Sequence, residues 1–290
     1  MSFVQHVLAV DWGTTNRRVY EIRGDEVVRT ERDDRGVTSV HDFPAEIAAI
    51  RARFGDLPIL LAGMVGSSIG WQVAPYVPTP AGIEALAANA MPVADRIWIV
   101  PGVSVNQNGR GDVMRGEEVQ LLGAVAAGLA PADALLVQPG THCKWVRMTG
   151  GIITGFTTAM TGELFALVRS HGILSSQLGA QVTPDVAFRE GVAEGTRRDL
   201  AASLFGVRAA KLLGLRDDAD AASYVSGLLI GSDVAARLAE TTHDTTYVLA
   251  DASLGALYVA AIETQGRPTI LVDSHAAFIA GITRIGALIA

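Results

Sequence analysis

The sequence predicts a mixed α/β fold made of two similar halves. The segment Val7 to Arg32 holds three strand-like runs, with the tight turn Gly24-Asp25 between the second and third, which predicts an antiparallel meander. Helix-period stretches and short apolar runs then alternate along the chain. The opening pattern returns at Leu135 to Gly155. A doubly wound sheet would instead open on a strand, a helix and a parallel strand.

The spacing of apolar residues predicts the helices and strands of the first half. We expect, in order, strands and helices at Val7–Trp12, Arg17–Arg23, Glu26–Arg32 (strands), Ala45–Phe54 (helix), Pro58–Ala62 (strand), Gly82–Ala90 (helix), Arg96–Val100 (strand) and Glu117–Ala127 (helix). The Pro- and Gly-bearing segment Ala126 to Asp133 then marks a boundary between the halves.

The second half is richer in helices. After the repeated opening we expect helices at Met160–Ser170, Pro184–Thr196, Leu200–Leu213, Ala221–Glu240, Leu254–Thr264 and His275–Leu288, and strands at Tyr247–Ala250 and Thr269–Val272. Their alanine content is ordinary for helices.

Composition narrows the class of protein. The 290 residues are 49% hydrophobic and 18% charged, a globular balance that can bury a sizeable core. The net charge of -7, without a dense Lys/Arg block, argues against nucleic acid as a partner and fits a sugar or metabolite better. A single cysteine, Cys143, excludes an intrachain disulfide framework. Without a signal-peptide pattern or an apolar stretch of about 18 residues, we expect a soluble cytoplasmic protein that does not enter a membrane.

Two similar turns open the two halves. Gly140-Thr141 lies 127 residues after Gly13-Thr14, and at the same offset Lys144 falls on Arg17. Turn glycines let phosphate oxygens approach the main chain, and threonine hydroxyls donate hydrogen bonds. Each turn taken alone could equally be an ordinary β-turn, and the second copy favours two phosphate-binding turns.

A carboxylate precedes the first turn. Asp11 ends the first strand, before a turn that runs from Gly13 through Thr14 and Thr15 to Asn16. A carboxylate at that place can hold a hydrated Mg²⁺ that in turn binds phosphate. The alternative is a turn with a capping Asp.

These residues carry a resemblance to a known family. Two such turns resemble the phosphate loops of the sugar kinase/actin/hsp70 superfamily, the first at Asp11 to Asn16 and the second at Pro139 to Lys144. Within it, the chain closely resembles the 2-keto-3-deoxygalactonokinase (2-dehydro-3-deoxygalactonokinase) family. The strings AGMVGSSIGW, VAPY, VMRGEEVQLLGA, PGTHCKWV and MTGEL match that family's pattern, from about Val7 to the C-terminus.

The resemblance implies a fold and an activity. It implies two RNase-H-like (actin-like ATPase) domains, residues 1–128 with the sugar-acid site and residues 129–290 with the adenosine site, and an active-site cleft between them. The last helix, 275–290, could pack back on the first domain. It also implies an ATP- and Mg²⁺-dependent kinase that phosphorylates the 6-hydroxyl of 2-keto-3-deoxy-D-galactonate in galactonate catabolism. Whether the protein forms a homodimer stays an open question at this point.

The loop AGMVGSSIGWQVAPY follows a strand and suits a sugar pocket. Ser67, Ser68 and Gln72 could donate or accept hydrogen bonds, and Trp71 offers an aromatic face. The alternative is a glycine-rich connector whose Trp71 fills the core.

Two adjacent carboxylates begin an apolar helix. Glu117 and Glu118 suit the helix dipole and could simply cap the helix. In related sugar kinases a carboxylate at this place takes the proton of the attacking hydroxyl. Adjacent helix positions point about 100° apart, so at most one of the two easily faces the site. We expect Glu117 to be the base, with Glu118 second and Asp112 third.

A keto-acid substrate needs a local cation. Arg115 fits a carboxylate bidentately and ranks ahead of Arg17 and Arg18, whereas Lys144 on the second turn suits the transferred phosphoryl group. Each could instead be an exposed charge. His142 is a candidate phosphate contact or an ordinary turn residue.

The adenosine segment departs from the family pattern. In VLADASLGALY only Gly255 is present where the superfamily usually has a glycine pair, and Asp251 and Ser253 replace small neutral residues. Asp251 could accept hydrogen bonds from ribose or cap the helix from Leu254. Thr161 to Glu163 could lie under the triphosphate or cap a helix.

Other function classes stay open. The same fold could serve another sugar or sugar-acid kinase, a phosphatase or ATPase that uses water as acceptor, or a regulatory module switched by ATP. The polar loop Ser67 to Trp71 favours a hydroxyl acceptor over water, and the chain lacks the appendages of filament and chaperone members.

Overall fold

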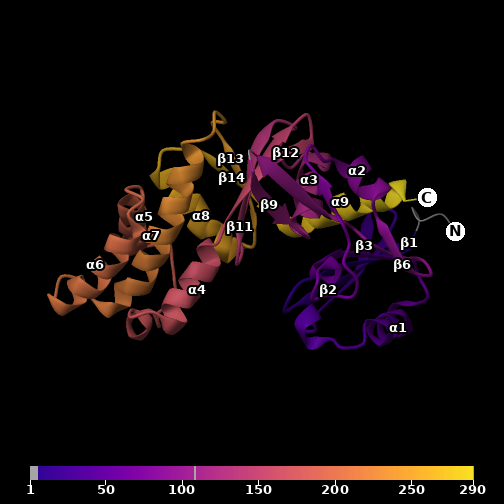
Figure 1. Ribbon diagram of the computed structural model, residues 1–290, viewed down its shortest axis with the longest axis horizontal. Helices are drawn as coiled ribbons and strands as arrows, with labels where there is room; N and C mark the ends of the chain where they lie inside the picture. Colours follow the sequence, from indigo (N-terminus) through magenta and orange to yellow (C-terminus); the bar gives the residue numbers. More distant parts are fainter. Residues whose placement is uncertain (1–5, 108, 290) are drawn as a thin grey trace. The chain divides into compact units, whose positions relative to one another are not determined.

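The computed structural model describes residues 6–107 and 109–289, which form two compact units (Figure 1). Unit 1 comprises Met1–Asp133, Arg147–Phe156 and Ser274–Ala290, and unit 2 comprises Ala134–Val146 and Thr157–Asp273. The chain therefore returns to unit 1 twice, whereas the sequence-based division at residue 128 is a single cut.

A six-stranded sheet of order β3-β2-β1-β4-β7-β6 organises unit 1. β1 pairs antiparallel with β2 and parallel with β4, and β2 pairs antiparallel with β3, so the predicted meander is confirmed. The strands are β1 (His6–Trp12), β2 (Arg17–Arg23), β3 (Glu26–Asp33), β4 (Ile59–Gly63), β6 (Met91–Ala94) and β7 (Ile97–Ile99). The helices and short 3₁₀ helices of this unit are η1 (Val37–Ser39), α1 (Phe43–Phe54), η2 (Met64–Gly66), α2 (Ile83–Ala88), α3 (Glu117–Ala126) and α9 (Ser274–Leu288).

A second, three-stranded sheet of unit 1 was not predicted. It has the order β5-β8-β9, formed by β5 (Tyr76–Pro78), β8 (Gly102–Gln107) and β9 (Arg110–Met114). β5 has three residues and β9 is largely exposed, so neither shows the apolar alternation by which strands are found. This sheet leads directly into Arg115 and the start of α3.

The helices α3 and α9 cross at two glycines. A Cβ on Gly123 would lie 1.9 Å from the carbonyl oxygen of Ala277, and a Cβ on Gly281 would lie 2.0 Å from that of Val119. Only glycine permits such a backbone approach. The last helix is therefore packed on α3 within unit 1, although α3 ends at Ala126 and α9 begins only at Ser274.

A five-stranded sheet has the corresponding order, β12-β11-β10-β13-β14. β10, β13 and β14 lie in unit 2, and Arg147–Phe156, the adjoining parts of β11 and β12, belongs to unit 1. β10 and β14 both pair parallel with β13. The strands are β10 (Ala134–Gln138), β11 (Cys143–Thr149), β12 (Ile152–Ala159), β13 (Thr246–Ala250) and β14 (Thr269–Asp273), and the helices are α4 (Thr161–His171), η3 (Ser175–Gln177), α5 (Val186–Gly195), α6 (Leu200–Leu212), α7 (Asp218–Leu238) and α8 (Ala252–Thr264).

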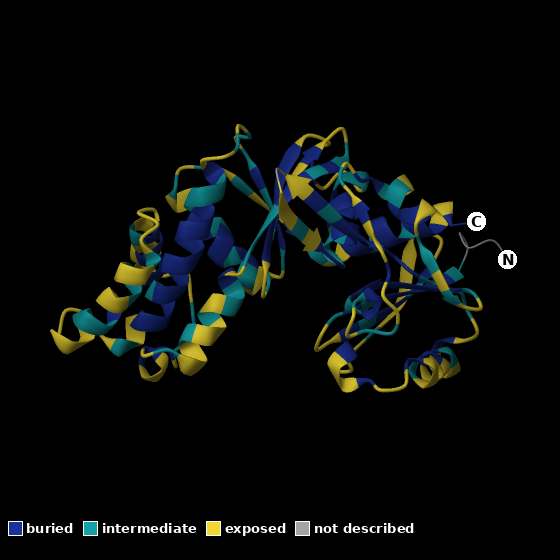
Figure 2. Cartoon of the chain, viewed as in Figure 1, coloured by how far each residue is buried: buried dark blue, intermediate teal, exposed yellow. Residues whose placement is uncertain are grey.

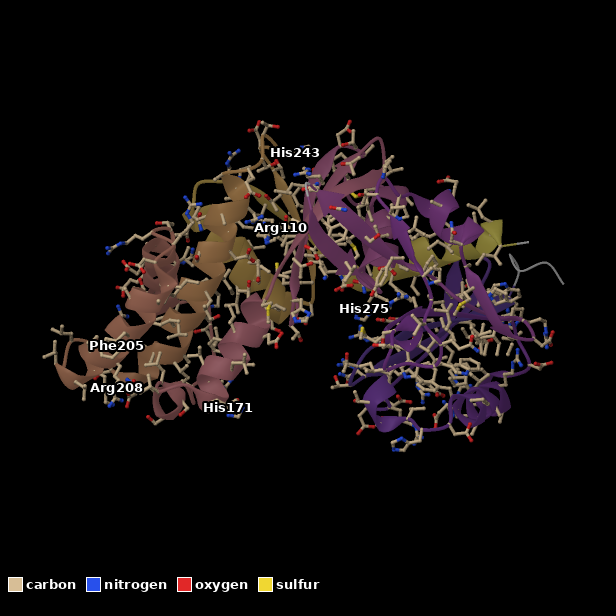
Figure 3. The ribbon with its side chains drawn as sticks, viewed as in Figure 1. Arg110, His171, Phe205, Arg208, His243 and His275 are labelled. Carbon is tan, nitrogen blue, oxygen red and sulfur yellow. The ribbon has the colours of Figure 1, made fainter. Side chains whose placement is uncertain are left out.

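The helix α7 is the centre of the helical layer of unit 2. Its middle is buried along several turns, as the dark-blue helix in Figure 2 shows. α5 approaches it closely, since a Cβ on Gly227 would lie 2.0 Å from the carbonyl oxygen of Phe188. α6 is peripheral: Phe205 is 62% exposed and points away from the helix layer (Figure 3). None of the described helices has both the length and the apolar character needed to cross a bilayer.

Candidate active site

The first turn expected to bind phosphate, Gly13–Asn16, joins β1 to β2. Gly13 N donates a hydrogen bond to Asn16 O over 2.9 Å, which closes the turn. The side chains of Thr14, Thr15 and Asn16 are exposed, and Asn16 Nδ2 donates to Thr15 Oγ1. The turn thus presents small polar groups outward, as a phosphate-binding turn requires.

The segment after β3 holds this turn from behind. Val37 N donates to Gly13 O over 3.0 Å, and the backbone N and Oγ1 of Thr38 both donate to Thr14 O. A Cβ on Gly36 would lie 2.2 Å from Thr14 O, so only glycine allows the two segments to meet. The turn is therefore a supported structure.

Asp11 lies beside the start of α3. It pairs with Ala62 across the parallel β1–β4 register, and the next pair is Trp12 with Gly63. Gly116, which precedes α3 with φ 105°, has its virtual Cβ 3.0 Å from Gly63 Cα. Burial raises the pKa of Asp11 to about 6; Arg18, whose Nη1 lies 3.9 Å from the carboxylate, lowers it, and nearby Glu117 raises it.

The two glutamates at the start of α3 have different surroundings. Glu117 is half-buried, and its Oε2 accepts a hydrogen bond from Arg115 N over 3.0 Å. Glu118 is fully buried and accepts the Gly116 N–H with both oxygens, at 2.8 and 2.7 Å. Burial, then the charge of Glu117, raises the pKa of Glu118 to about 8, so it is largely protonated at neutral pH. Asp112, the third candidate, accepts a hydrogen bond from Val113 N on β9.

These contacts separate the candidate bases. Both glutamates cap the start of α3, in line with the alternative interpretation of the sequence. Glu117 alone of the pair is both partly accessible and close enough to Asp11 to raise its pKa. Its role as base stays a prediction.

The surroundings of Asp11 fit a magnesium ion. Within the described residues no group of three or more His, Cys, Asp or Glu side chains gathers as a metal cluster. Mg²⁺ does not need one, because it commonly takes one or two protein carboxylates and completes its shell with water and substrate phosphate. Asp11 and Glu117 repel one another electrostatically, and a bound cation would relieve that repulsion.

Arg115 is buried, so it is not the exposed charge that the sequence left open. It is 8% exposed, its Nη2 donates to Ala74 O over 2.6 Å, and its guanidinium lies 4.3 Å from the centroid of the Tyr76 ring. Nε and Nη1 are buried and find no hydrogen-bond partner among the described residues. A virtual Cβ on Gly66 would lie 2.8 Å from Nη1, so this glycine makes room for the cation. Nε–H and Nη1–H lie on different edges of the guanidinium, so each is left for an acceptor of its own, and either could serve a carboxylate oxygen.

In the loop that contains Ser67, Ser68 and Trp71, the side chains of Ser67 and Trp71 contact other groups of the protein. Ser67 Oγ donates to Met64 O over 2.7 Å, and Ser68 is exposed. Trp71 stacks on Phe43, with ring centroids 6.2 Å apart and planes 5° from parallel. Trp71 and Gln72 line a hollow whose other residues come from α1, Asp56 and the β6–β7 region, and neither Arg115 nor Glu117 is among them. Sugar contacts by this loop stay predictions.

The second turn expected to bind phosphate, which contains Gly140 and Thr141, is supported by α4. A Cβ on Gly162 would lie 2.3 Å from Gly140 O, and Glu163 N donates to Thr141 O over 2.9 Å. His142 Nε2 and Glu163 Oε2 are 2.6 Å apart. Thr141 and His142 are exposed, so this turn too presents polar groups outward.

An apolar hollow of about 180 Å³ adjoins the second turn in unit 2. Gly140, Thr161 and Gly162 border it on one side, and its other walls are largely aliphatic and aromatic. The residues of those walls are Phe165, Val182, Ser226, Leu229, Ile230, Leu254, Leu257 and Tyr258. An apolar slot beside a phosphate turn is a suitable place for a nucleotide base.

The remaining candidates of unit 2 have clear positions. Asp251 caps α8: its Oδ1 accepts from the backbone N of Ser253 and Leu254 and from Ser253 Oγ. The helix-cap interpretation therefore holds, and contact with ribose stays a prediction. Lys144 is buried on β11, and its Nζ donates to Thr158 Oγ1 over 2.9 Å. Cys143 is buried, as expected.

Sequence analysis missed Asp233, a buried carboxylate of α7. Its Oδ2 accepts from Trp145 Nε1 and from Thr161 Oγ1, both at 3.0 Å, and burial raises its pKa. It thus links the strand that carries Lys144 to the first residue of α4. The available signal was an aspartate inside the apolar run of a long helix.

The chain matches the family model described as 2-keto-3-deoxy-galactonokinase over residues 11–285. It is 38% identical to the 2-dehydro-3-deoxygalactonokinase of Escherichia coli (strain K12) over 289 residues, which cover 98% of each chain.

Solved structures agree with the fold. A Sinorhizobium meliloti crystal structure described as a candidate 2-dehydro-3-deoxygalactonokinase superimposes with a TM-score of 0.90 at 37% identity, covering 96% of this chain and 97% of that one. Component A of the (R)-2-hydroxyglutaryl-CoA dehydratase of Acidaminococcus fermentans, 13% identical, aligns with a TM-score of 0.52 over 98% of this chain and 96% of that one, a likeness of fold alone. The predicted class of two RNase-H-like domains of the actin-like ATPase type is confirmed, and the chain belongs to the 2-keto-3-deoxy-galactonokinase family.

Proposed function

We propose that the protein transfers the γ-phosphoryl group of ATP to the 6-hydroxyl of 2-keto-3-deoxy-D-galactonate, in the cytoplasmic breakdown of galactonate. The observation that carries the proposal is the likeness to a named 2-dehydro-3-deoxygalactonokinase over 98% of both chains. The buried Arg115, with two donors unpartnered among the described residues, supports an acidic acceptor in particular.

In unit 1, the acceptor would be bound and activated. Arg115 would pair with the substrate carboxylate through one of its two unpartnered nitrogens, with Ser67, Ser68, Trp71 and Gln72 as further sugar contacts. Glu117 would accept the proton of the 6-hydroxyl as its oxygen bonds to the γ-phosphorus. Glu118, buried and largely protonated, would keep the start of α3 in place through Gly116.

In unit 2, the donor would be bound. The base would occupy the apolar hollow beside Gly140, and the ribose would meet Asp251 and Ser253. Thr141 and His142 would donate hydrogen bonds to phosphate oxygens, and Lys144 would neutralise charge on the transferred group. The first turn (Gly13, Thr14, Thr15 and Asn16), which belongs to unit 1, would also donate hydrogen bonds to phosphate oxygens. As the new P–O bond forms, the bond between the γ-phosphorus and the bridging oxygen breaks, and ADP leaves with that oxygen.

Asp11 would hold Mg²⁺, which when bound neutralises phosphate charge. The carboxylate itself would supply one ligand to the ion. On this proposal a bound cation offsets the cost of burying the Asp11 carboxylate in its charged form.

The test is ADP release with ATP and Mg²⁺ and one acceptor at a time: the galactonate derivative, its C4 epimer, galactose, glucose or none. We expect rapid ADP release with the galactonate derivative, a 6-phosphate ester by ³¹P NMR, and no reaction with the two neutral sugars. Equal ADP release without any acceptor would instead indicate an ATPase, and no ADP release with either acid would refute the proposed reaction.

A further inference from the structure

Arg17 is the first residue of β2, directly after the first phosphate turn, and it is 1% exposed. Its Nε and Nη2 donate to the two carboxylate oxygens of Asp33, over 3.2 and 2.7 Å. Its Nη1 donates to Glu46 Oε2 over 3.0 Å. All three guanidinium nitrogens are thus held by carboxylates of this chain, which leaves Arg17 unsuited to bind the substrate.

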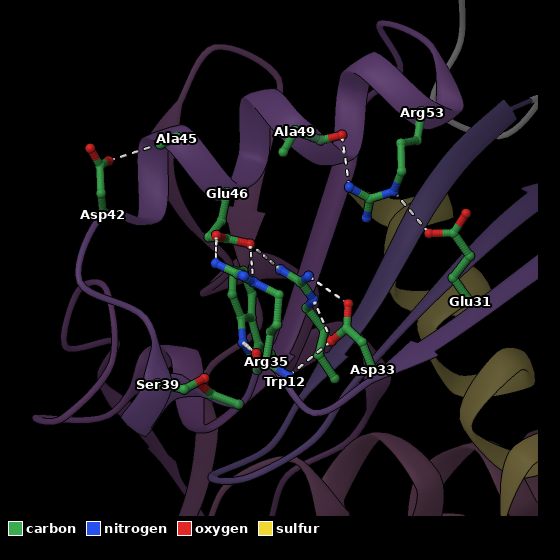
Figure 4. Close-up of polar contacts among 12 residues, drawn as sticks. Trp12, Glu31, Asp33, Arg35, Ser39, Asp42, Ala45, Glu46, Ala49 and Arg53 are labelled. Atoms are coloured by element: carbon green, nitrogen blue, oxygen red, sulfur yellow. Dashed lines mark hydrogen bonds and ion pairs between the residues drawn. The ribbon is translucent and has the colours of Figure 1, made fainter.

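Glu46 joins a second arginine to the first. Arg35 Nε donates to the same Oε2 over 3.0 Å, and Arg35 Nη2 pairs with Oε1 (Figure 4). Burial raises the pKa of Glu46, but the hydrogen bonds and charges of Arg35 and Arg17 outweigh burial and leave the pKa lowered. The Arg17 cluster, which is Arg17, Asp33, Arg35 and Glu46, therefore contains two positive and two negative charges. Removing one member would leave an uncompensated charge on the others.

The Arg17 cluster is joined to both ends of the turn. The Arg17 guanidinium lies 4.9 Å from the centroid of the Trp12 ring, and Trp12 Nε1 donates to Arg35 O over 2.8 Å. Trp12 precedes the turn and Arg17 follows it.

The cluster is also joined to the segment behind the turn. Arg35 is followed by Gly36, Val37 and Thr38, which supply the close backbone approach and the hydrogen bonds to Gly13 and Thr14. A change in the cluster would therefore disturb the residues at both ends of the turn and the segment Gly36 to Thr38 that packs against it.

We propose that Arg17 is a positioning residue for phosphoryl transfer, which holds the Gly13–Asn16 turn in place through Trp12 and the Arg35–Thr38 segment. The inference rests on the proposed function in that this turn binds phosphate. Because a misplacement of about 1 Å can cost roughly 100-fold in rate, the effect falls on kcat. The acid and the adenosine part of ATP are bound by other residues in the proposed function, so both KM values change less than kcat.

The test compares Arg17→Lys with Arg53→Lys. Arg53 borders the same charged hollow, but its Nε pairs with Glu31 and its Nη1 with Ala49 O, without contact to the turn. Lysine keeps the charge of Arg17 but cannot serve Asp33 and Glu46 with three nitrogens in one plane. We expect Arg17→Lys to lower kcat roughly 10- to 100-fold with both KM values within about threefold, and Arg53→Lys to leave kcat unchanged.

Hydrogen exchange provides a readout that does not need a substrate. In the full-length protein, Arg17→Lys should speed amide exchange in peptides covering residues 12–17 and 36–38, while the α7 peptides stay as in the wild type. If Arg17→Lys fails to fold, Glu46→Gln replaces it with the same expectations. Unchanged exchange in these two segments, or a wild-type kcat in the folded variant, would overturn the proposal. Faster exchange in a protein that does not phosphorylate the acid would refute only the proposed function.

Discussion

The hydroxyl of Thr161 donates a hydrogen bond over 3.0 Å to the carboxylate of Asp233, 72 residues later in the chain and buried in α7. Thr161 is the first residue of α4 and borders the apolar hollow beside the second phosphate turn. The buried carboxylate therefore holds one wall of the proposed nucleotide site, which leads to the first prediction.

Replacing Thr161 by valine should weaken ATP binding. Valine keeps the shape of the side chain but loses the hydrogen bond to Asp233, so α4 can shift against Gly140. We expect the KM for ATP to rise roughly five- to thirtyfold, equivalent to about 1–2 kcal/mol, while the KM for the acid stays constant. Steady-state kinetics with each substrate varied measures both values.

The matched control is Asp185→Ala. Asp185 is also a carboxylate of unit 2 that accepts hydrogen bonds, but it caps α5 through Phe188 N. Its loss should lower stability by about 1 kcal/mol and leave the KM for ATP unchanged. Equal effects of the two variants on that KM would show that Thr161 acts only through general stability.

Removing the Arg115 side chain should weaken binding of the keto-deoxy acid far more than binding of ATP. A desolvated carboxylate that loses its charged partner typically costs about 2 to 5 kcal/mol, or roughly 30-fold to several thousand-fold in affinity. We therefore expect Arg115→Ala to raise the KM for the keto-deoxy acid by at least about 30-fold. Lys144→Ala should instead act chiefly on kcat. If the KM for the acid changes by less than about twofold, a group other than Arg115 binds the substrate carboxylate.

Asp11→Asn should abolish phosphoryl transfer and leave the fold intact. With a folded pKa of about 6 against 3.8 in the unfolded chain, metal-free Asp11 binds its proton more tightly when folded. Its contribution to stability is therefore full below pH 3.8 and is lost as the pH rises to about 6. At pH 7.5 without Mg²⁺ the variant should melt no lower than the wild type.

Mg²⁺ supplies the readout for the metal role of Asp11. The ion should raise the melting temperature of the wild type and not that of Asp11→Asn, because only the wild type keeps the binding carboxylate. Near-normal turnover of the variant at saturating Mg²⁺, or equal thermal shifts, would contradict this role.

Glu118→Gln should flatten the pH dependence of stability. The folded pKa of Glu118 is about 8 and the unfolded value 4.5, so the wild type should lose stability as the pH rises from 4.5 to about 8. Glutamine cannot ionise, and its amide oxygen can still accept the Gly116 N–H. Urea unfolding at pH 5, 6.5 and 8 measures the slope, and Glu84→Gln, an exposed first-turn glutamate on α2, is the control. A slope in Glu118→Gln equal to that of the wild type would refute burial of a protonated carboxyl.

The sequence by itself was enough for the features that are local along the chain. The meander strands, most helices, the two polar turns and the family all follow from periodicity, turn residues and short motifs. The strands β5, β6, β8 and β9 were missed. β5 has three residues and β9 is largely exposed, so neither shows an apolar alternation, and pairing with β8 stabilises both instead.

Only the tertiary structure decided what each charged side chain does. Arg17 and Arg115 are similar candidates in the sequence, yet Arg17 is held by Asp33 and Glu46, which lie 16 and 29 residues away, and Arg115 is buried with two donors unpartnered among the described residues. Likewise, Glu117 and Glu118 are adjacent, but only Glu118 is fully buried and has a pKa of about 8. A charge takes its role from the partners and the burial that folding brings to it, and residues distant in the chain supply both.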